Sequence, residues 1–179
     1  FLTHGYHVSM GIGIGLAMGA QTLNRDRPVV LVTGDGAFGF SIAEFDTMVR
    51  HQLPVVVVIL NNRNWGAVRH YQEVFSGPDR VTGTQLDNGD YHDTAASLGA
   101  FGRYVEDEKD IVPAIRAAIA SGKPACINIR VDINAIPPDS QGTPPPARIV
   151  LMSDGKTTDG RSDDVAAQGC VVLHYDPSG

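Results

Sequence analysis

The sequence predicts an α/β fold in which a parallel sheet is covered by helices on both faces. Segments with strand-like and helix-like patterns alternate along the chain, which is typical of right-handed βαβ units. The strand-like segments 29–33 and 55–60 are continuous apolar runs rich in β-branched residues, as in strands buried on both faces. We therefore expect a Rossmann-like, three-layer domain over residues 1–138, incomplete at its N-terminus.

The composition suits a soluble globular domain. The chain has 179 residues, of which 42% are hydrophobic and 19% charged, enough for one sizeable core. A net charge of −6 and a pI near 5.4 argue against nucleic acid or an anionic membrane as partner. No apolar run approaches the roughly 18 residues of a membrane span. Cys126 and Cys170 match no metal or redox spacing, so we expect a cytoplasmic protein.

The first half of the chain contains two helices and two strands by its pattern. Residues 7–23 form a Gly-rich apolar run, read as a buried helix that packs closely on a sheet. The strand 29–33 follows and ends at the turn 34–36. Ser41 and Glu44 have the spacing of a capping box, which predicts that the next helix begins at Ser41. The strand 55–60 then ends on Asn61.

The second half continues the alternation and then changes character. We expect a polar, ligand-facing loop over 76–90, and the elements after it are a helix at 93–100, a strand at 101–105, a helix at 111–121 and a strand at 125–131. Residues 139–179 are predicted to be a linker and an atypical, partly disordered tail with strand-like segments at 149–152 and 170–174. The tail faintly resembles the metal-site turn of a von Willebrand A domain, so a metal-dependent adhesion fragment stays an alternative.

Polar residues follow the first two strands at the edge of the sheet where ligands bind in open α/β folds. Asp35 offers a carboxylate, Asn62 an amide oxygen, and the turn after Asn62 offers backbone carbonyls. Oxygen ligands of this kind suit Mg²⁺, which usually takes one or two carboxylates together with phosphate oxygens. Gly36 allows backbone amides to approach a diphosphate, and the N-terminus of the following helix favours its negative charge.

A dinucleotide site is the competing interpretation of the same turn. Gly34, Gly36 and Gly39 have the spacing of a nucleotide-binding fingerprint between a strand and a helix. That fingerprint requires an acidic residue at the end of the next strand, where this chain has Asn61 and Asn62. A non-catalytic nucleotide-binding α/β module remains an alternative, and metal dependence of binding separates the two.

The spacing of the two polar turns resembles the signature of thiamine-diphosphate enzymes: GDG at 34–36, the 24 residues 37–60, then NN at 61–62. The resemblance implies a C-terminal cofactor-binding domain in which Mg²⁺ clamps the diphosphate of thiamine diphosphate. The implied metal ligands are Asp35, Asn62 and the backbone carbonyl of Asn64. The implied cofactor-binding residues are Val8, Met10, Gly34, Asp35, Gly36, Ala37, Asn62 and Asn64.

Within these enzymes, several strings resemble benzaldehyde lyase, among them FLTHGY, SMGIG, TGDGAFGFSIAEFDT, NNRNWGA, GPDRVTGTQL and PACIN. By this resemblance Met10 supports the bent cofactor, although its periodicity alone would make it an ordinary core residue. Trp65 and Ala67 would line the substrate side, and His4 is a candidate to face the substrate. Acetolactate synthases and 2-hydroxyacyl-CoA lyases share the broader pattern and are the alternatives.

The resemblance implies a C–C lyase or carboligase acting on 2-hydroxy ketones, in which the thiazolium of the cofactor accepts the electron pair of the broken bond. It also implies a small-molecule carbonyl substrate and a homo-oligomeric parent protein. Such enzymes take an activating glutamate from a pyrimidine-binding domain of the same chain or of a partner subunit. We find no such domain in this sequence, which starts at Phe1 and looks like part of a longer protein, so we expect the isolated chain to be inactive.

Overall fold

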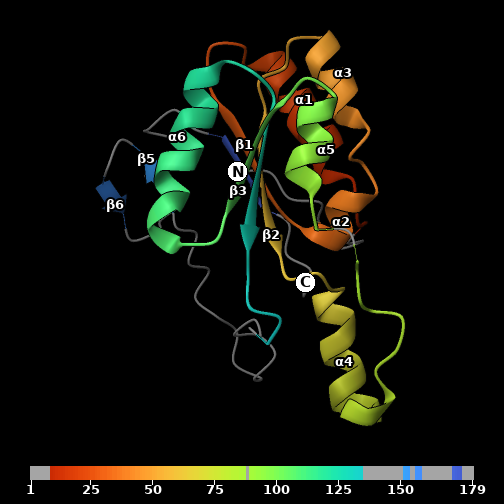
Figure 1. Cartoon of the computed structure of the whole chain (residues 1–179). Helices are drawn as coiled ribbons and strands as arrows, with labels where there is room; N and C mark the ends of the chain where they lie inside the picture. The colour runs from red at the N-terminus through yellow and green to blue at the C-terminus, as the bar shows by residue number, and fades with distance from the viewer. Residues whose placement is uncertain (1–8, 88, 135–150, 154–155, 159–170, 175–179) are drawn as a thin grey trace.

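The computed structural model describes residues 9–87, 89–134, 151–153, 156–158 and 171–174 (Figure 1). In this part of the chain the main sheet has the strand order β3-β4-β2-β1-β7, and all neighbouring strands are parallel. The strands are β1 (Val29–Gly34), β2 (Val56–Asn61), β3 (Phe101–Val105), β4 (Ala125–Arg130) and β7 (Val171–His174). The predicted parallel α/β fold is confirmed.

Helices cover both faces of this sheet (Figure 1). One face carries α1 (Gly13–Leu23), α2 (Asp35–Gly39), α3 (Glu44–Arg50) and α5 (Tyr91–Ser97), whose side chains share one buried cluster. The other face carries α6 (Ile111–Ser121), which contributes to a second cluster. No helix among the described residues has the length and apolar character needed to cross a membrane.

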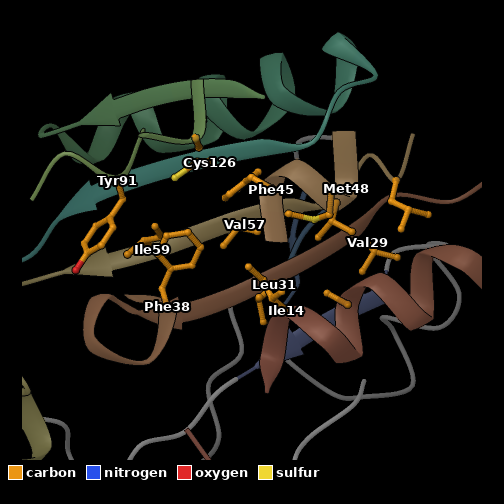
Figure 2. Packing of buried hydrophobic residues seen from close by; sticks show 14 of the residues in the cluster. Ile14, Val29, Leu31, Phe38, Phe45, Met48, Val57, Ile59, Tyr91 and Cys126 are labelled. Carbon is orange, nitrogen blue, oxygen red and sulfur yellow. The ribbon is translucent and has the colours of Figure 1, made fainter. Parts of the chain in front are cut away.

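Strand alternation builds the two clusters, because successive side chains of a strand point to opposite faces. Leu31 of β1 and Val57 of β2 point to the first face, where they pack with Phe45 and Met48 (Figure 2). Val30, Val56 and Val58 point to the second face and pack with α6. Both faces of the central strands are buried, which is why their sequences are uninterrupted apolar runs.

The predicted helix start at Ser41 is wrong. Helix α3 begins at Glu44, with Ala43 as its N-cap and no side-chain cap bond. The hydroxyl of Ser41 instead donates to the carbonyl oxygen of Gly11, at 2.7 Å. Residues 35–39 form the short helix α2, which the sequence pattern did not indicate. The hydrogen bond of Ser41 links the segment that follows α2 to the segment that precedes α1.

The boundaries and burial of two other helices also differ from the prediction. Helix α1 begins only at Gly13 and is buried on one face, while Leu16 and Leu23 on the other are 38% and 85% exposed. The small residues Ala17 and Ala20 do face the sheet, as expected. Helix α5 covers residues 91–97 rather than 93–100.

Helix α4 (Gly66–Ser76) projects away from the body of the domain and has no buried residue (Figure 1). The 3₁₀ turn η2 (Pro78–Arg80) follows it, and the side chain of Gln72 exchanges two hydrogen bonds with the backbone of Thr82. The chain then returns to the sheet edge. The predicted polar loop at 76–90 is therefore the return arm of a helical projection.

Residues 139–147, the predicted linker, lie outside the described residues. Of the strand-like segments in the tail, one coincides with β7, which pairs with β1, and the other overlaps β5 (Leu151–Ser153). Strand β5 forms an antiparallel pair with β6 (Lys156–Thr158). The domain boundary at residue 138 stays a prediction.

Candidate functional site

A cavity of about 310 Å³ opens at the carboxyl edge of β1 and β2. Every predicted site residue that the structure describes lines it: Met10, Gly34, Asp35, Gly36, Ala37, Asn62, Asn64, Trp65 and Ala67. His4 and Val8 lie outside the described residues. The cavity has the size of a small-molecule site. The topology thus brings together residues from the segment before α1, from the end of β1 and the start of α2, and from the turn after β2 and the start of α4.

Asp35 is a buried carboxylate at the base of this cavity, only 2% exposed. Its Oδ1 accepts a hydrogen bond from the backbone N–H of Gly36 at 3.0 Å, and its Oδ2 accepts one from the N–H of Asn64 at 3.1 Å. Burial raises the pKa of Asp35 above its ordinary 3.8, and these backbone bonds oppose the rise. No ion pair to Asp35 occurs within the described residues. Within the part of the chain that the structure describes, the carboxylate therefore has hydrogen-bond donors but no cationic side chain paired with it.

The turn after β2 presents oxygen atoms beside Asp35. The Oδ1 of Asn62 accepts from the N–H of Asn64 at 3.0 Å. An isolated antiparallel β-bridge pairs Asn64 with Gln85 of the return arm. Its hydrogen bonds are accepted by the carbonyl oxygens of Arg63 and Thr84, so the bridge does not use the carbonyl oxygen of Asn64. The side-chain Oδ1 of Asn64 is buried and has no hydrogen-bond partner among the described residues.

The oxygen atoms of Asp35, Asn62 and Asn64 suit a hard cation. The Asp35 carboxylate has no counter-charge, and the Oδ1 of Asn64 no donor, among the described residues. Both groups are costly to bury unless a ligand satisfies them. The atoms concerned are oxygens, as Mg²⁺ and Ca²⁺ prefer. The described residues contain no group of three or more His, Cys, Asp or Glu side chains that could hold a metal, so they provide no zinc-like site.

Gly36 has a local structural role in addition to the predicted one. Its N–H donates to Asp35, as described above, and a Cβ atom at this position would lie 2.7 Å from the Trp65 ring. Glycine here therefore admits the indole, which also packs on Phe40 with 5.6 Å between ring centroids. Contact of Gly36 and Ala37 with a diphosphate stays a prediction.

The wall of the cavity is largely apolar. Met10 is 47% exposed and lies at the cavity, not in the core. Five further apolar side chains of this wall were missed from the sequence: Val32, Leu60, Val68, Tyr71 and Val131. The signal for two of them was present, because residues 65, 68 and 71 recur at the spacing of one helix face directly after the NN turn.

A second, more polar cavity of about 960 Å³ lies on the other side of the same turn. Asn62 and Asn64 line both cavities, while Arg63, Tyr104 and Arg130 line only the second. Arg130 there forms an exposed ion pair with Glu106, at 3.1 Å. The turn 61–64 is therefore the partition between the two cavities.

Comparison with known proteins identifies relatives of this chain. Residues 1–129 match the family described as thiamine pyrophosphate enzyme, C-terminal TPP binding domain. The acetolactate synthase large subunit IlvG of Mycobacterium tuberculosis is 42% identical over 124 residues, covering 69% of this chain and 22% of that protein. The 2-hydroxyacyl-CoA lyase of Arabidopsis thaliana is 36% identical over 128 residues, with 69% and 22% covered.

Two solved structures share the fold. The thiamine diphosphate-dependent 4-hydroxybenzoylformate decarboxylase of Rhodococcus jostii RHA1 has a TM-score of 0.64 and 29% identity, covering 69% of this chain and 23% of that one. Benzoylformate decarboxylase from Polynucleobacter necessarius has a TM-score of 0.63 and 26% identity, with 72% and 25% covered. The chain spans about a fifth of the length of the curated relatives that it matches.

Proposed function

The chain belongs to the thiamine pyrophosphate enzymes as a C-terminal TPP-binding domain, and we propose that its cavity holds thiamine diphosphate through a Mg²⁺ ion. The ligands in this proposal are Asp35, Asn62 and the carbonyl oxygen of Asn64. The observation that carries it is the buried Asp35 carboxylate, which has no counter-charge among the described residues. A divalent cation at this point would neutralise it and leave positive charge for the phosphates.

The residues of the chain would bind and orient the cofactor and exclude water. When bound, thiamine diphosphate supplies a thiazolium that accepts the electron pair of a broken C–C bond. Met10 would support the cofactor from below, while Trp65 and Ala67 would border the substrate. Leu60 and Val68 extend this apolar wall and would lower the local dielectric constant around the reacting atoms.

For the substrate we propose aromatic 2-hydroxy ketones, cleaved or joined as by benzaldehyde lyases. The apolar wall supports an aryl group, and among the described residues that line the cavity, Asp35 alone is charged. An acyl-CoA would need cations for its phosphates. Arg69 is instead paired with Glu73 at 2.8 Å, and Arg63 lines the second cavity. The two solved relatives are named for benzoylformate substrates, which are also aromatic.

A pyrimidine-binding domain, from the same chain or a partner subunit of a homo-oligomer, would complete the site. Helix α4 supports this proposal, because Val68 and Tyr71 on it line the cavity and are 43% and 51% exposed. Phe75, which is 79% exposed, stacks on Tyr71 with 6.0 Å between ring centroids. A contiguous exposed apolar surface of this kind is typical of an interaction site. The short span of the chain relative to its relatives leaves room for such a domain.

Binding of thiamine diphosphate should require a divalent cation and weaken as the pH falls. The folded pKa of Asp35 lies above its unfolded value, so the folded chain binds more protons between pH 3.8 and the raised pKa. As the pH falls through this window, the Asp35 contribution to the stability of the metal-free chain therefore increases. The cation site is lost in the same window, because a protonated carboxyl is a poor ligand.

Isothermal titration calorimetry of the purified chain with thiamine diphosphate measures this, with Mg²⁺ and with excess chelator, at several pH values. We expect binding only with Mg²⁺, and weaker binding at lower pH. Equal affinity with and without chelator would rule out the Mg²⁺ site.

The chain alone should not cleave benzoin, and activity should require the pyrimidine-binding domain. We expect that supplying this domain by co-expression yields turnover, with kcat/KM for benzoin above those for pyruvate and a 2-hydroxyacyl-CoA. Steady-state kinetics with the three substrates measures the preference. If either alternative exceeds benzoin by more than about tenfold, a difference of about 1.4 kcal/mol in transition-state stabilisation, the aryl assignment is wrong. Turnover by the chain alone would refute the need for a second domain.

A further inference from the structure

A buried network of two asparagines lies next to the turn 61–64, which carries the proposed cation ligands Asn62 and Asn64. Asn61 ends β2 and is 4% exposed, and Asn128 in β4 is fully buried. The Nδ2 of Asn61 donates to Oδ1 of Asn128 at 3.0 Å and to the carbonyl oxygen of Gly89 at 3.1 Å. The Nδ2 of Asn128 donates to the same carbonyl at 2.6 Å and lies 3.2 Å from Nδ1 of His92.

Every polar hydrogen of the two amides has a partner in this arrangement. Each NH₂ group has two protons, and each proton faces one of the acceptors just named. The Nδ1 of His92 is the acceptor for the second proton of the Asn128 amide when the ring proton is on Nε2, and this Nε2 lies 3.6 Å from a carboxylate oxygen of Asp93. A buried network in which all members are satisfied is rigid, because any rotation of one amide leaves several groups unpaired.

The network reaches the turn through Asn61. Its Oδ1 accepts the N–H of Arg63 at 3.0 Å. Arg63 has a φ of 56°, in the left-handed region that a non-glycine residue adopts only when its surroundings hold it there. The next N–H along the chain, that of Asn64, donates to Asp35 and Asn62. The conformation of Arg63 therefore sets where the oxygen atoms of the turn lie.

We propose that Asn128 is a positioning residue for the cation site, acting through Asn61 and Arg63. This rests on the proposed function, because the site it positions is the Mg²⁺ site. Asn128 lines neither cavity, so it would not touch the cofactor or the substrate. Outer partners that orient metal ligands typically change metal affinity by about 10- to 100-fold when removed. We expect a loss of this size when the amide of Asn128 is replaced.

The test compares Asn128→Leu with Gln21→Met in the 179-residue chain. The two residues are matched, since both are fully buried amides with three polar contacts. Gln21 lies in α1, and its partners are backbone atoms of Asn24, Arg27 and Val29, away from the turn. Each substitution keeps the bulk of the side chain and removes its hydrogen bonds. Both variants lose stability, so the readouts must report on the turn itself.

One readout is Mn²⁺ affinity with thiamine diphosphate present, followed by the electron paramagnetic resonance of free Mn²⁺. The other is hydrogen exchange of the Arg63 and Asn64 amides in the metal-free chain. For Asn128→Leu we expect affinity about 10- to 100-fold below wild type, together with faster exchange at these two amides. Gln21→Met should stay within about threefold of wild type in affinity and retain the protection.

If Asn128→Leu does not fold, Asn128→Asp replaces it, because it keeps the acceptor toward Asn61 and loses both donors. The added carboxylate of Asn128→Asp would by its charge alone raise the affinity for a cation. A lower Mn²⁺ affinity in this variant therefore supports a positioning role for Asn128. If the Asn128 variant keeps the wild-type Mn²⁺ affinity and the wild-type protection of the Arg63 and Asn64 amides, the inference is overturned and the proposed function still stands. Equal losses in the Gln21→Met chain would also overturn it. A wild-type chain that binds no Mn²⁺ with thiamine diphosphate overturns both.

Discussion

Replacing Asp35 by asparagine is expected to lower the affinity for Mg²⁺ and thiamine diphosphate by at least about 30-fold. Removing one partner of a buried charge pair costs about 2–5 kcal/mol, and Asp35 is the carboxylate of the site. The stability of the metal-free chain should change by less than about 1 kcal/mol. The amide removes a buried charge, which stabilises, but its Nδ2 cannot accept one of the two backbone N–H groups, which destabilises by a similar amount.

Calorimetry for affinity and urea denaturation for stability separate these effects. Asp46→Asn is the matched control, because Asp46 is an exposed carboxylate of α3 paired with Arg50, and exposed pairs contribute little. That variant should bind as the wild type does. If Asp35→Asn binds within threefold of wild type, Asp35 is not a ligand of the cation. If it unfolds the metal-free chain, its role is structural.

Alanine at position 102 is expected to lower the free energy of unfolding by about 3 kcal/mol, at the upper end of the usual cost of overpacking. Gly102 lies in β3 directly under α5. A Cβ atom there would overlap the carbonyl oxygen of His92 and lie 3.2 Å from Cβ of Ala96. The obstacle is backbone, which cannot rotate away as a flexible side chain can. The helix would have to lift from the sheet, and the contacts of Tyr91 and Ala95 with the core would weaken.

Urea denaturation of Gly102→Ala measures this loss, and Gly19→Ala provides the matched comparison. Gly19 is in the middle of α1, and a Cβ atom there meets nothing within 4 Å. The same substitution should therefore stabilise the chain, by up to about 1 kcal/mol, because alanine favours a helix. A Gly102→Ala chain as stable as the wild type would show that α5 is not fixed against β3.

The strands were predictable because their signal is local. Residues 29–33, 55–60, 101–105 and 125–131 are bounded by turn residues, and each agrees with an observed strand to within one residue. Helix boundaries were less predictable because tertiary contacts decide them. Ser41 has the spacing of a cap, yet its hydroxyl finds Gly11, thirty residues earlier, and no local pattern contains that partner.

The core of the site followed from topology. Two parallel strands joined by a helical crossover end at the same edge, so Asp35 and Asn62 had to meet there. Asn128 could not be recognised in this way, because its relation to Asn61 depends on the β2–β4 register, in which residues 61 and 130 are opposite each other. Helix α4 was missed for another reason. Its apolar residues face outward, so the usual link between helical periodicity and burial does not hold.

The strand order has a consequence for how the site forms during synthesis. The central strand β2 pairs on one side with β1, its neighbour in sequence, and on the other with β4, the last strand of residues 9–134. Pairing between distant segments requires a large loop to close first, and it makes folding slow. As the chain leaves the ribosome, β2 therefore keeps one open edge until β4 has emerged. The turn 61–64 follows β2 directly, so it acquires its final shape only after β4 has docked.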